Sequence, residues 1–237
     1  MPPAGPPQNL DELARSLLKN GPVKVLQVSP RRVRIQFGGR WVADTTEAQL
    51  LWEHAYYPSY YLPLAAFENG VLEYPEEQSQ EGYKLAKLNA GGASTDRVIV
   101  FGGGDSPLSN LVRVEFSAAD AWFEEDSRID VHPKDPFKRV DVVFSSRPVR
   151  VLLAGTEVAN ANAGALHLDT VTKCPYKGEA NYYDILVDGK TYKDIVWYYK
   201  TAKLECAGVA GALCFYNEKV DIELDGKLLE KPKSPFS

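Results

Sequence analysis

The sequence predicts a mainly β protein made of two tandem small antiparallel β-sheet or open-barrel domains, with short helices and an N-terminal helix. From Val23 onward, β-branched and aromatic residues alternate with polar ones in short runs that end at Gly pairs, a pattern typical of hairpins. Residues 149–160 repeat residues 33–44 without gaps, which indicates an internal duplication. Long helical periods between strands are missing, so a parallel α/β fold is disfavoured.

The N-terminal helix is expected directly after a Pro-rich segment. Asn9 can cap the helix with its side chain, and Gly21 and Pro22 end it. One face of this helix carries Leu10, Leu13, Leu17 and Leu18. Because this apolar stripe is short and the polar face is mixed in sign, we expect a helix that packs on the domain rather than one that binds a membrane or a partner.

The strand pattern predicts that the two copies start and finish alike. Both start with a hairpin, as in Val33–Phe37 followed by Gly38 and Gly39. Residues 122–125 resemble residues 215–218, which we interpret as the matching end of each copy. Two segments are expected to be loops, namely residues 84–94 and residues 102–107.

A change of composition marks the domain boundary. At residues 132–139, two prolines and several charges interrupt the strand pattern. The expected organisation is a Pro-rich segment with a helix at 1–22, a first β-rich repeat at 23–131, a linker at 132–139 and a second, shortened repeat at 140–237.

The composition excludes several classes of function. A formal net charge of -5 and a pI near 5.4 provide no basic field, which argues against general nucleic-acid binding and against binding to an anionic membrane. Neither a secretory leader nor a membrane-spanning run is visible, so we expect a soluble, cytoplasmic protein. The cysteines, Cys174, Cys206 and Cys214, are odd in number and lack a CxxC pair, and we interpret them as thiols.

The most unusual segment of the first repeat is rich in aromatic residues with polar tips. It contains the ligand-binding candidates Trp52, Tyr57, Tyr60 and Tyr61, together with His54, a candidate general acid or base. Such residues line ligand pockets and interfaces. The alternative is a pair of strands whose hydroxyl groups satisfy loop backbone, with His54 as a structural hydrogen-bonding residue.

A second candidate site lies in the second repeat. A thiol at Cys174 beside lysines can become a nucleophile, and the ammonium of Lys177 can hold an anionic group over aromatic rings. Further ligand-binding candidates in this repeat are Tyr176, Tyr183 and Trp197. The alternative is that Pro175 and Gly178 set a turn, with Cys174 a small buried residue and Lys177 solvated.

Metal and cofactor sites are not expected. His54, His132 and His167 show no ligand spacing, so no metal is predicted, and no cofactor motif is present. The run Gly102–Gly104 lacks the spacing of a phosphate-binding loop and is expected to be a turn.

Several motifs in the same order resemble the family of domain of unknown function number 427, which also carries a nucleotidyltransferase-like label. The resembling segments are residues 52–63, 132–141, 174–178, 197–199 and 215–221. The resemblance implies a compact, mainly β unit that occurs here twice. Here the Tyr- and Pro-bearing segment is present only in the first half and Cys-Pro-Tyr-Lys-Gly only in the second, which implies a composite or lost site if one pocket needs both.

Three functions remain open from the sequence. The first is a small-molecule-binding protein or an enzyme with an aromatic-lined pocket. The second is a non-catalytic module for protein interaction, with a homodimer as one form. The third is nucleotide handling, as the family label implies, with Lys138, Arg139 and Lys177 as phosphate contacts.

Overall fold

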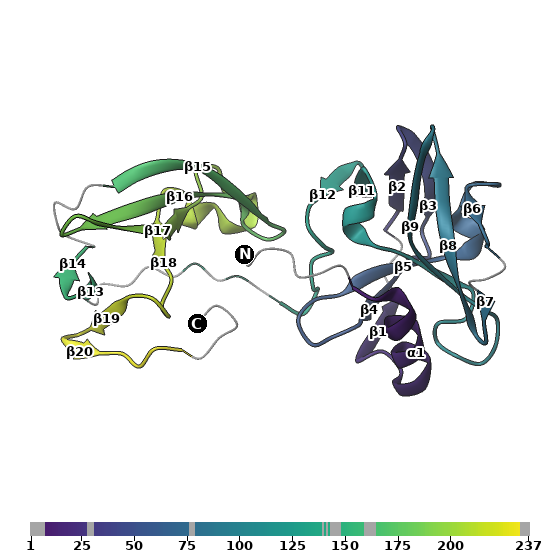
Figure 1. The fold of residues 1–237 in the computed structure, drawn as a ribbon, viewed down its shortest axis with the longest axis horizontal. Coiled ribbons are helices and arrows are strands. Elements are labelled where there is room, and N and C mark those ends of the chain that lie inside the picture. The colour runs from purple at the N-terminus through teal and green to yellow at the C-terminus, as the bar shows by residue number, and fades with distance from the viewer. Residues whose placement is uncertain are drawn as a thin grey trace. The chain divides into compact units, whose positions relative to one another are not determined.

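The computed structural model describes residues 8–27, 31–75, 79–138, 140, 142, 148–158 and 165–232. Contacts divide the chain into two compact units, with the division between residues 138 and 139. Residues 132–138, which the sequence marks as a linker, belong to the first unit. The described residues are mainly β, with one α-helix near the N-terminus, as the sequence predicts (Figure 1).

The first unit contains the helix α1 and the strands β1 to β12. Their bounds are α1 Leu10–Asn20, β1 Lys24–Gln27, β2 Val33–Phe37, β3 Arg40–Thr45, β4 Gln49–Trp52, β5 Ser59–Pro63, β6 Leu72–Glu73, β7 Ser79–Gln80, β8 Tyr83–Ala90, β9 Ala93–Phe101, β10 Leu111–Val114, β11 Ala121–Glu124 and β12 Ser127–Ile129. Two short 3-10 helices are η1 Leu64–Ala66 and η3 Phe116–Ala118.

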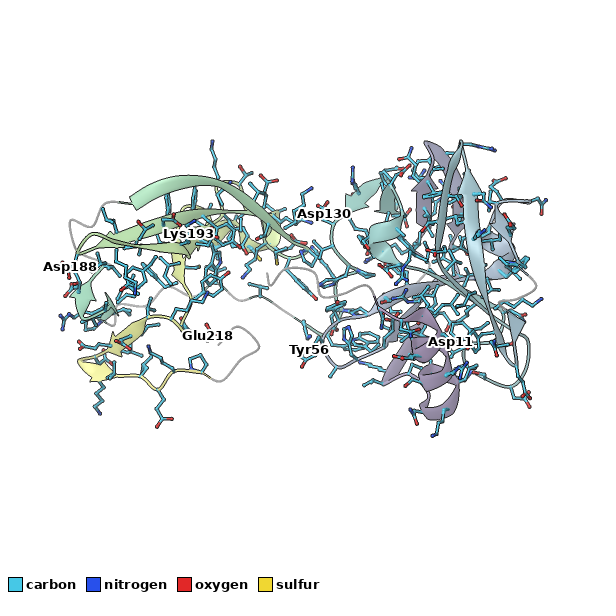
Figure 2. The ribbon with its side chains drawn as sticks, viewed as in Figure 1. Asp11, Tyr56, Asp130, Asp188, Lys193 and Glu218 are labelled. Carbon is cyan, nitrogen blue, oxygen red and sulfur yellow. The ribbon has the colours of Figure 1, made fainter. Side chains whose placement is uncertain are left out.

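The second unit contains the strands β13 to β20. Their bounds are β13 Val149–Leu153, β14 Thr156–Glu157, β15 Ala165–Cys174, β16 Gly178–Val187, β17 Lys190–Tyr198, β18 Leu213–Phe215, β19 Asp221–Leu224 and β20 Lys227–Leu228. The 3-10 helix η4 spans Leu204–Val209. Asp188 marks the tip of the β16–β17 hairpin (Figure 2).

Two antiparallel sheets and α1 enclose the core of the first unit. Sheet A has the order β1-β4-β5-β10-β9-β8-β6, with β7 also paired to β8, and sheet B has the order β12-β11-β2-β3. One face of sheet A packs on sheet B through residues such as Ile35 and Leu62. The opposite face packs on α1 through residues such as Leu17 and Phe101. Sheet A is therefore covered on both faces.

The second unit has a similar pair of sheets. Sheet C has the order β14-β13-β19-β20, and sheet D has the order β15-β16-β17-β18. The two sheets pack together through residues such as Val151, Ile185 and Val196. The other face of sheet D carries a smaller cluster around Ala180, Tyr182 and Tyr199, to which residues of the η4 region add contacts.

The strand pairing confirms that the second unit repeats the first. Strands β3-β2-β11-β12 correspond to β14-β13-β19-β20, and β6-β8-β9-β10 correspond to β15-β16-β17-β18. The turns also agree, because Glu125 and Asp225, which follow β11 and β19, have positive φ angles of 51° and 52°. Strands β4 and β5 have no counterpart in the described part of the second unit.

One predicted equivalence between the copies is wrong. Val33 pairs with Glu124, and its counterpart Val149 pairs with Leu224. This register makes Trp122 the counterpart of Ile222, whereas the sequence similarity between residues 122–125 and 215–218 had aligned it with Phe215. Residues 122–125 and 215–218 are similar only because both contain aromatic and acidic residues. The hydrogen bonds between paired strands determine which residues of the two copies are equivalent.

Residues 84–94, predicted to be a loop, are also different in the structure. They form most of β8 and the start of β9, joined by a tight turn at Gly91 and Gly92. The Lys, Ala and Asn residues of this segment favour strands weakly, but Ala86 and Leu88 are buried in the core. Packing against the neighbouring strands therefore overrides the local propensity. Residues 102–107 form a loop, as predicted.

The N-terminal helix begins as its sequence indicates. The side chain of Asn9 accepts hydrogen bonds from the backbone N–H groups of Asp11 and Glu12 at 3.1 and 3.3 Å. We expect Asn9→Ala to lower the free energy of unfolding of the first unit by about 1 kcal/mol, because two helix N–H groups lose their acceptor. Urea denaturation of the full chain measures this loss, and Asn9→Asp, which keeps the acceptor, is expected to retain wild-type stability.

The described residues contain no helix with the length and apolar character needed to cross a membrane. All three cysteines are free thiols; Cys206 is buried, and Cys174 and Cys214 are half-buried.

Candidate functional site

The aromatic residues of the first unit lie on opposite faces of sheet A. Tyr60 and Trp52 face sheet B, and Tyr61 faces α1. The hydroxyl of Tyr60 donates to Glu124 at 2.7 Å, and the indole N–H of Trp52 donates to Asp135 at 3.3 Å. Burial raises the pKa of Tyr60 above its ordinary value, and the negative charge of Glu124 adds to this. The Tyr61 hydroxyl donates to Glu53 at 3.1 Å. All three side chains are therefore core residues whose polar groups are hydrogen-bonded within the unit.

His54 and Tyr57 lie outside this core, in the loop after β4. The ring of Tyr57 meets His54 edge to face at 4.4 Å and stacks on His132 at 4.2 Å. His54 Nδ1 accepts a hydrogen bond from the backbone N–H of Tyr56 at 3.2 Å. Burial lowers the pKa of His132, against its hydrogen bond to Pro133, and the nearby charge of Lys138 lowers it further. The five first-unit candidates therefore do not converge on one pocket.

Three of the candidate residues of the second unit do lie together on one surface. Cys174, Lys177 and Trp197 lie on the face of sheet D that is turned away from sheet C, together with residues that sequence reasoning did not select. We call this surface the thiol face; its residues are Cys174, Lys177, Tyr182, Trp197, Tyr199, Cys214 and Tyr216. Tyr183 lies on the opposite face, stacked on Tyr198 at 4.8 Å, and Tyr176 lies in the β15–β16 turn.

Strand register explains how distant residues meet on the thiol face. Trp197 is directly opposite Tyr182 on β16 and Cys214 on β18. Side chains that face each other across an antiparallel pair point to the same side. Tyr199, two residues after Trp197, points the same way.

Three contacts fix the side chains of this face. The Lys177 ammonium lies 5.4 Å from the centre of the Tyr199 ring. The rings of Trp197 and Tyr216 are 4.6 Å apart, and the Tyr182 hydroxyl hydrogen-bonds the Thr172 hydroxyl at 2.7 Å. The face is thus a set of packed aromatic rings beside the Lys177 ammonium, and the Lys219 ammonium lies 4.7 Å from the centre of the Tyr216 ring.

Burial favours the protonated forms of three groups of the thiol face, Tyr199, Cys214 and Tyr216. Burial raises the pKa of Tyr199, and its neighbours Cys174 and Cys214 raise it further. Burial raises the pKa of Tyr216 to about 12. Burial also raises the pKa of the Cys214 thiol, although Lys177 opposes this. The carboxylates of Asp194 and Glu218 also raise the pKa of Tyr216. The raised pKa values keep Tyr199 and Tyr216 as hydroxyls and Cys214 as a thiol at neutral pH.

The duplication shows what is special about this face. The register makes Trp197 and Tyr199 the counterparts of Ile99 and Phe101, and Cys214 the counterpart of Arg113. In the first unit that face is covered by the leucines of α1. Among the described residues of the second unit no α-helix covers it, and Cys174, Lys177 and Trp197 stay half-buried.

Comparison with known proteins agrees with the duplicated architecture. A family model described as a domain of unknown function, DUF427, matches residues 25–87 and residues 165–226. No curated protein matches the chain. One matched segment lies in each unit, and the two together cover more than half of the sequence. The second segment contains all residues of the thiol face. The chain therefore belongs to the DUF427 family.

Proposed function

We propose that this protein binds a small molecule on the thiol face of its second unit. The observation that carries the proposal is the contrast between the two copies. The first unit covers this face of its sheet with apolar helix residues, whereas the second lines it with Lys177, two thiols and polar-tipped aromatic rings. The charged residue on this face of the first unit, Arg113, is buried and paired with Glu53 at 2.7 Å, whereas Lys177 in the second unit stays half-buried.

The side chains define the chemical class of ligand. An aromatic ring or other flat group can pack against the half-buried ring of Trp197, and the Lys177 ammonium can pair with a negative charge. The hydroxyl group of the half-buried Tyr216 can add a hydrogen bond. We therefore propose a planar, anionic small molecule as the ligand.

A thermal-shift screen with planar anions tests this function. A ligand that binds only the folded state stabilises it by about 2.7 kcal/mol at a concentration 100 times its Kd, which raises the melting temperature. We expect a hit whose effect is lost in Lys177→Met. The matched control is Lys190→Met, which removes another ammonium held over a ring, that of Tyr192 at 4.8 Å, in the same unit.

Two results would contradict the proposal. One is a screen in which planar anions leave the melting temperature of the wild type unchanged. The other is a hit that shifts Lys177→Met and Lys190→Met equally, which would place the ligand elsewhere. Circular dichroism of both variants checks that the second unit remains folded.

A protein-interaction module is the second candidate function. Aromatic side chains are exposed on the first unit near the β4–β5 loop: Tyr56 is 67% exposed, and Phe137 is 62% exposed. Figure 2 labels Tyr56 in this loop. Exposed aromatic residues are enriched in interfaces. If they form one, light scattering will show concentration-dependent association that Tyr56→Ser with Phe137→Ser abolishes.

Two other functions that the sequence left open, nucleotide handling and thiolate catalysis, have less support. For nucleotide handling, Lys138 and Lys177 belong to different units, and Arg139 lies outside the described residues. Lys138 already donates to the backbone carbonyl of Tyr56. The raised pKa of Cys214 disfavours a thiolate at that residue, and catalysis by Cys174 stays a prediction.

A further inference from the structure

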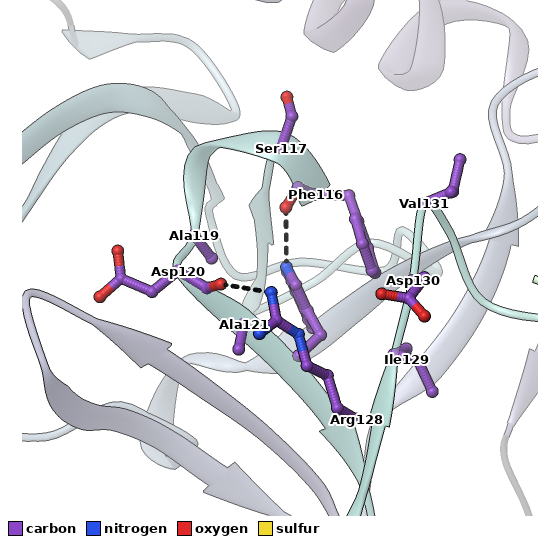
Figure 3. Close-up of a pocket in the computed structure, with 10 residues that line it drawn as sticks. Phe116, Ser117, Ala119, Asp120, Ala121, Arg128, Ile129, Asp130 and Val131 are labelled. Atoms are coloured by element: carbon purple, nitrogen blue, oxygen red, sulfur yellow. Dashed lines mark hydrogen bonds between the residues drawn. The ribbon is translucent and has the colours of Figure 1, made fainter. Parts of the chain in front are cut away.

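A cavity in the first unit is lined by none of the residues that the sequence predicted as catalytic or ligand-binding. Its volume is about 290 Å³, and it lies between η3 and the β11–β12 hairpin (Figure 3). Its lining residues are Phe116, Ser117, Ala119, Asp120, Ala121, Trp122, Arg128, Ile129, Asp130 and Val131. This volume is close to the lower end of ligand pockets, about 300–1,000 Å³.

The apolar part of the cavity wall is rigid. The rings of Phe116 and Trp122 stack with centroids 5.4 Å apart and an angle of 7° between planes. The Trp122 indole N–H donates to the Phe116 carbonyl at 3.1 Å, and this bond fixes both residues. A preformed aromatic wall can bind the apolar body of a small ligand without losing much side-chain entropy.

Arg128 supplies the charged part of the wall. Its guanidinium donates one hydrogen bond, 3.3 Å long, to the backbone carbonyl of Asp120, as Figure 3 shows. The carboxylate of Asp120 instead accepts from the Gly39 N–H at 3.0 Å. Within the described residues, no ion pair joins Arg128 to a carboxylate. A guanidinium prefers to donate two hydrogen bonds to one carboxylate, and one from the ligand can provide that pairing.

The second copy shows that the fold does not need this arginine. Phe123 pairs with Arg128 in the first unit, and the equivalent pair in the second unit is Glu223 with Leu228. The same two-stranded hairpin therefore forms with a leucine at this position. The guanidinium belongs to the cavity of the first unit rather than to the hairpin.

We propose that this cavity binds a small organic carboxylate with an apolar body, whose carboxylate pairs with Arg128 and whose apolar body lies against Phe116. This site is separate from the thiol face and does not depend on the function proposed for it. We propose a ligand with a single negative charge, because Arg128 is the one basic residue among the described residues that line the cavity.

The test uses 3-phenylpropanoate as the probe and its uncharged amide as the matched compound. Titrations of the full chain are followed by NMR at the Trp122 indole N–H, whose signal is assigned with Trp122→Phe. We expect the carboxylate to shift this signal and the amide to leave it unchanged. In Arg128→Gln the carboxylate is expected to bind about tenfold more weakly or worse, because the charged pairing is lost.

Arg40→Gln is the control variant, since Arg40 is also an exposed arginine of sheet B. It is expected to bind like the wild type. The proposal is overturned if the carboxylate leaves the Trp122 signal unchanged, if the amide shifts it equally, or if Arg128→Gln binds as tightly as Arg40→Gln. Lys177→Met is expected to leave this titration unchanged, so the outcome is independent of the thiol face.

Discussion

Replacing Glu53 by alanine is expected to lower the free energy of unfolding of the first unit by about 3–5 kcal/mol, because it leaves a buried guanidinium without its partner. Glu53 Oε1 lies 2.7 Å from Arg113 Nε, and the two side chains are only 4% and 6% exposed. A second hydrogen bond joins Arg113 Nη2 to Glu53 Oε2 at 3.1 Å, and the Tyr61 hydroxyl donates to Oε1 at 3.1 Å. Urea denaturation of the full chain, with hydrogen exchange to report each unit separately, measures the loss.

A matched ion pair near the surface provides the control. Arg97 and Glu115 are 25% and 23% exposed, so solvent screens their attraction more strongly. Glu115→Ala is expected to cost about 1 kcal/mol or less. Equal losses in Glu115→Ala and Glu53→Ala would show that burial does not set the strength of the Glu53 pair.

The Glu53–Arg113 ion pair also makes the free energy of unfolding depend on pH in the acidic range. Burial opposes ionisation of Glu53, but Arg113 and the hydroxyls of Tyr61 and Ser59 outweigh it and lower the pKa of Glu53 below its ordinary 4.5. A carboxyl with a depressed folded-state pKa stabilises the fold fully above its unfolded-state pKa, and this contribution is lost as pH falls through the folded value. Wild-type stability should therefore fall below pH 4.5, with a smaller fall in the double variant Glu53→Leu with Arg113→Met.

Gly38→Ala and Gly91→Ala are each expected to cost the first unit about 3 kcal/mol or more, because they combine a left-handed backbone with overpacking. The two glycines have φ angles of +56° and +55°. A Cβ at Gly38 would lie 1.9 Å from the Ala90 carbonyl oxygen, and a Cβ at Gly91 would lie 1.9 Å from the Gly38 carbonyl oxygen. The turns β2–β3 and β8–β9 thus touch through their backbones, which joins sheet B to sheet A.

Alanine variants of the neighbouring glycines distinguish the cost of the left-handed backbone from the cost of overpacking. Gly39 and Gly92 also have positive φ angles, but a Cβ there meets nothing within 4 Å. Their alanine variants should lose only the backbone term, about 1–2 kcal/mol. If Gly38→Ala and Gly39→Ala unfold at the same urea concentration, the contact between the turns does not stabilise the unit.

The second unit supports this interpretation. At the positions equivalent to Gly38 and Gly91 it has Ala154 and Asp188, with φ angles of 51° and 49°. A side chain is therefore compatible with each of these turns in isolation. The requirement for glycine in the first unit comes from the close approach of the two turns.

The sequence by itself determined the features that depend on neighbouring residues. These include the capped N-terminal helix, the alternating strands, the hairpin glycines and the duplication, because a period of two or 3.6 residues and a turn signal are local properties. The DUF427 resemblance likewise followed from motifs that are contiguous in the chain, and the family model confirmed it. Two predictions from short sequence segments were wrong. Residues 84–94 were predicted to be a loop, and residues 215–218 were aligned with the wrong strand of the first copy.

Only the tertiary structure decided which of the candidate residues meet. Cys174 and Cys214 come from β15 and β18, the outer strands of sheet D, and both lie close enough to Tyr199, which directly follows β17, to raise its pKa. Tyr60 and Tyr61 are adjacent in the chain yet face different cores, because sheet B covers one face of sheet A and α1 covers the other. Which face of a strand is covered depends on elements distant in sequence, and strand periodicity carries no information about them.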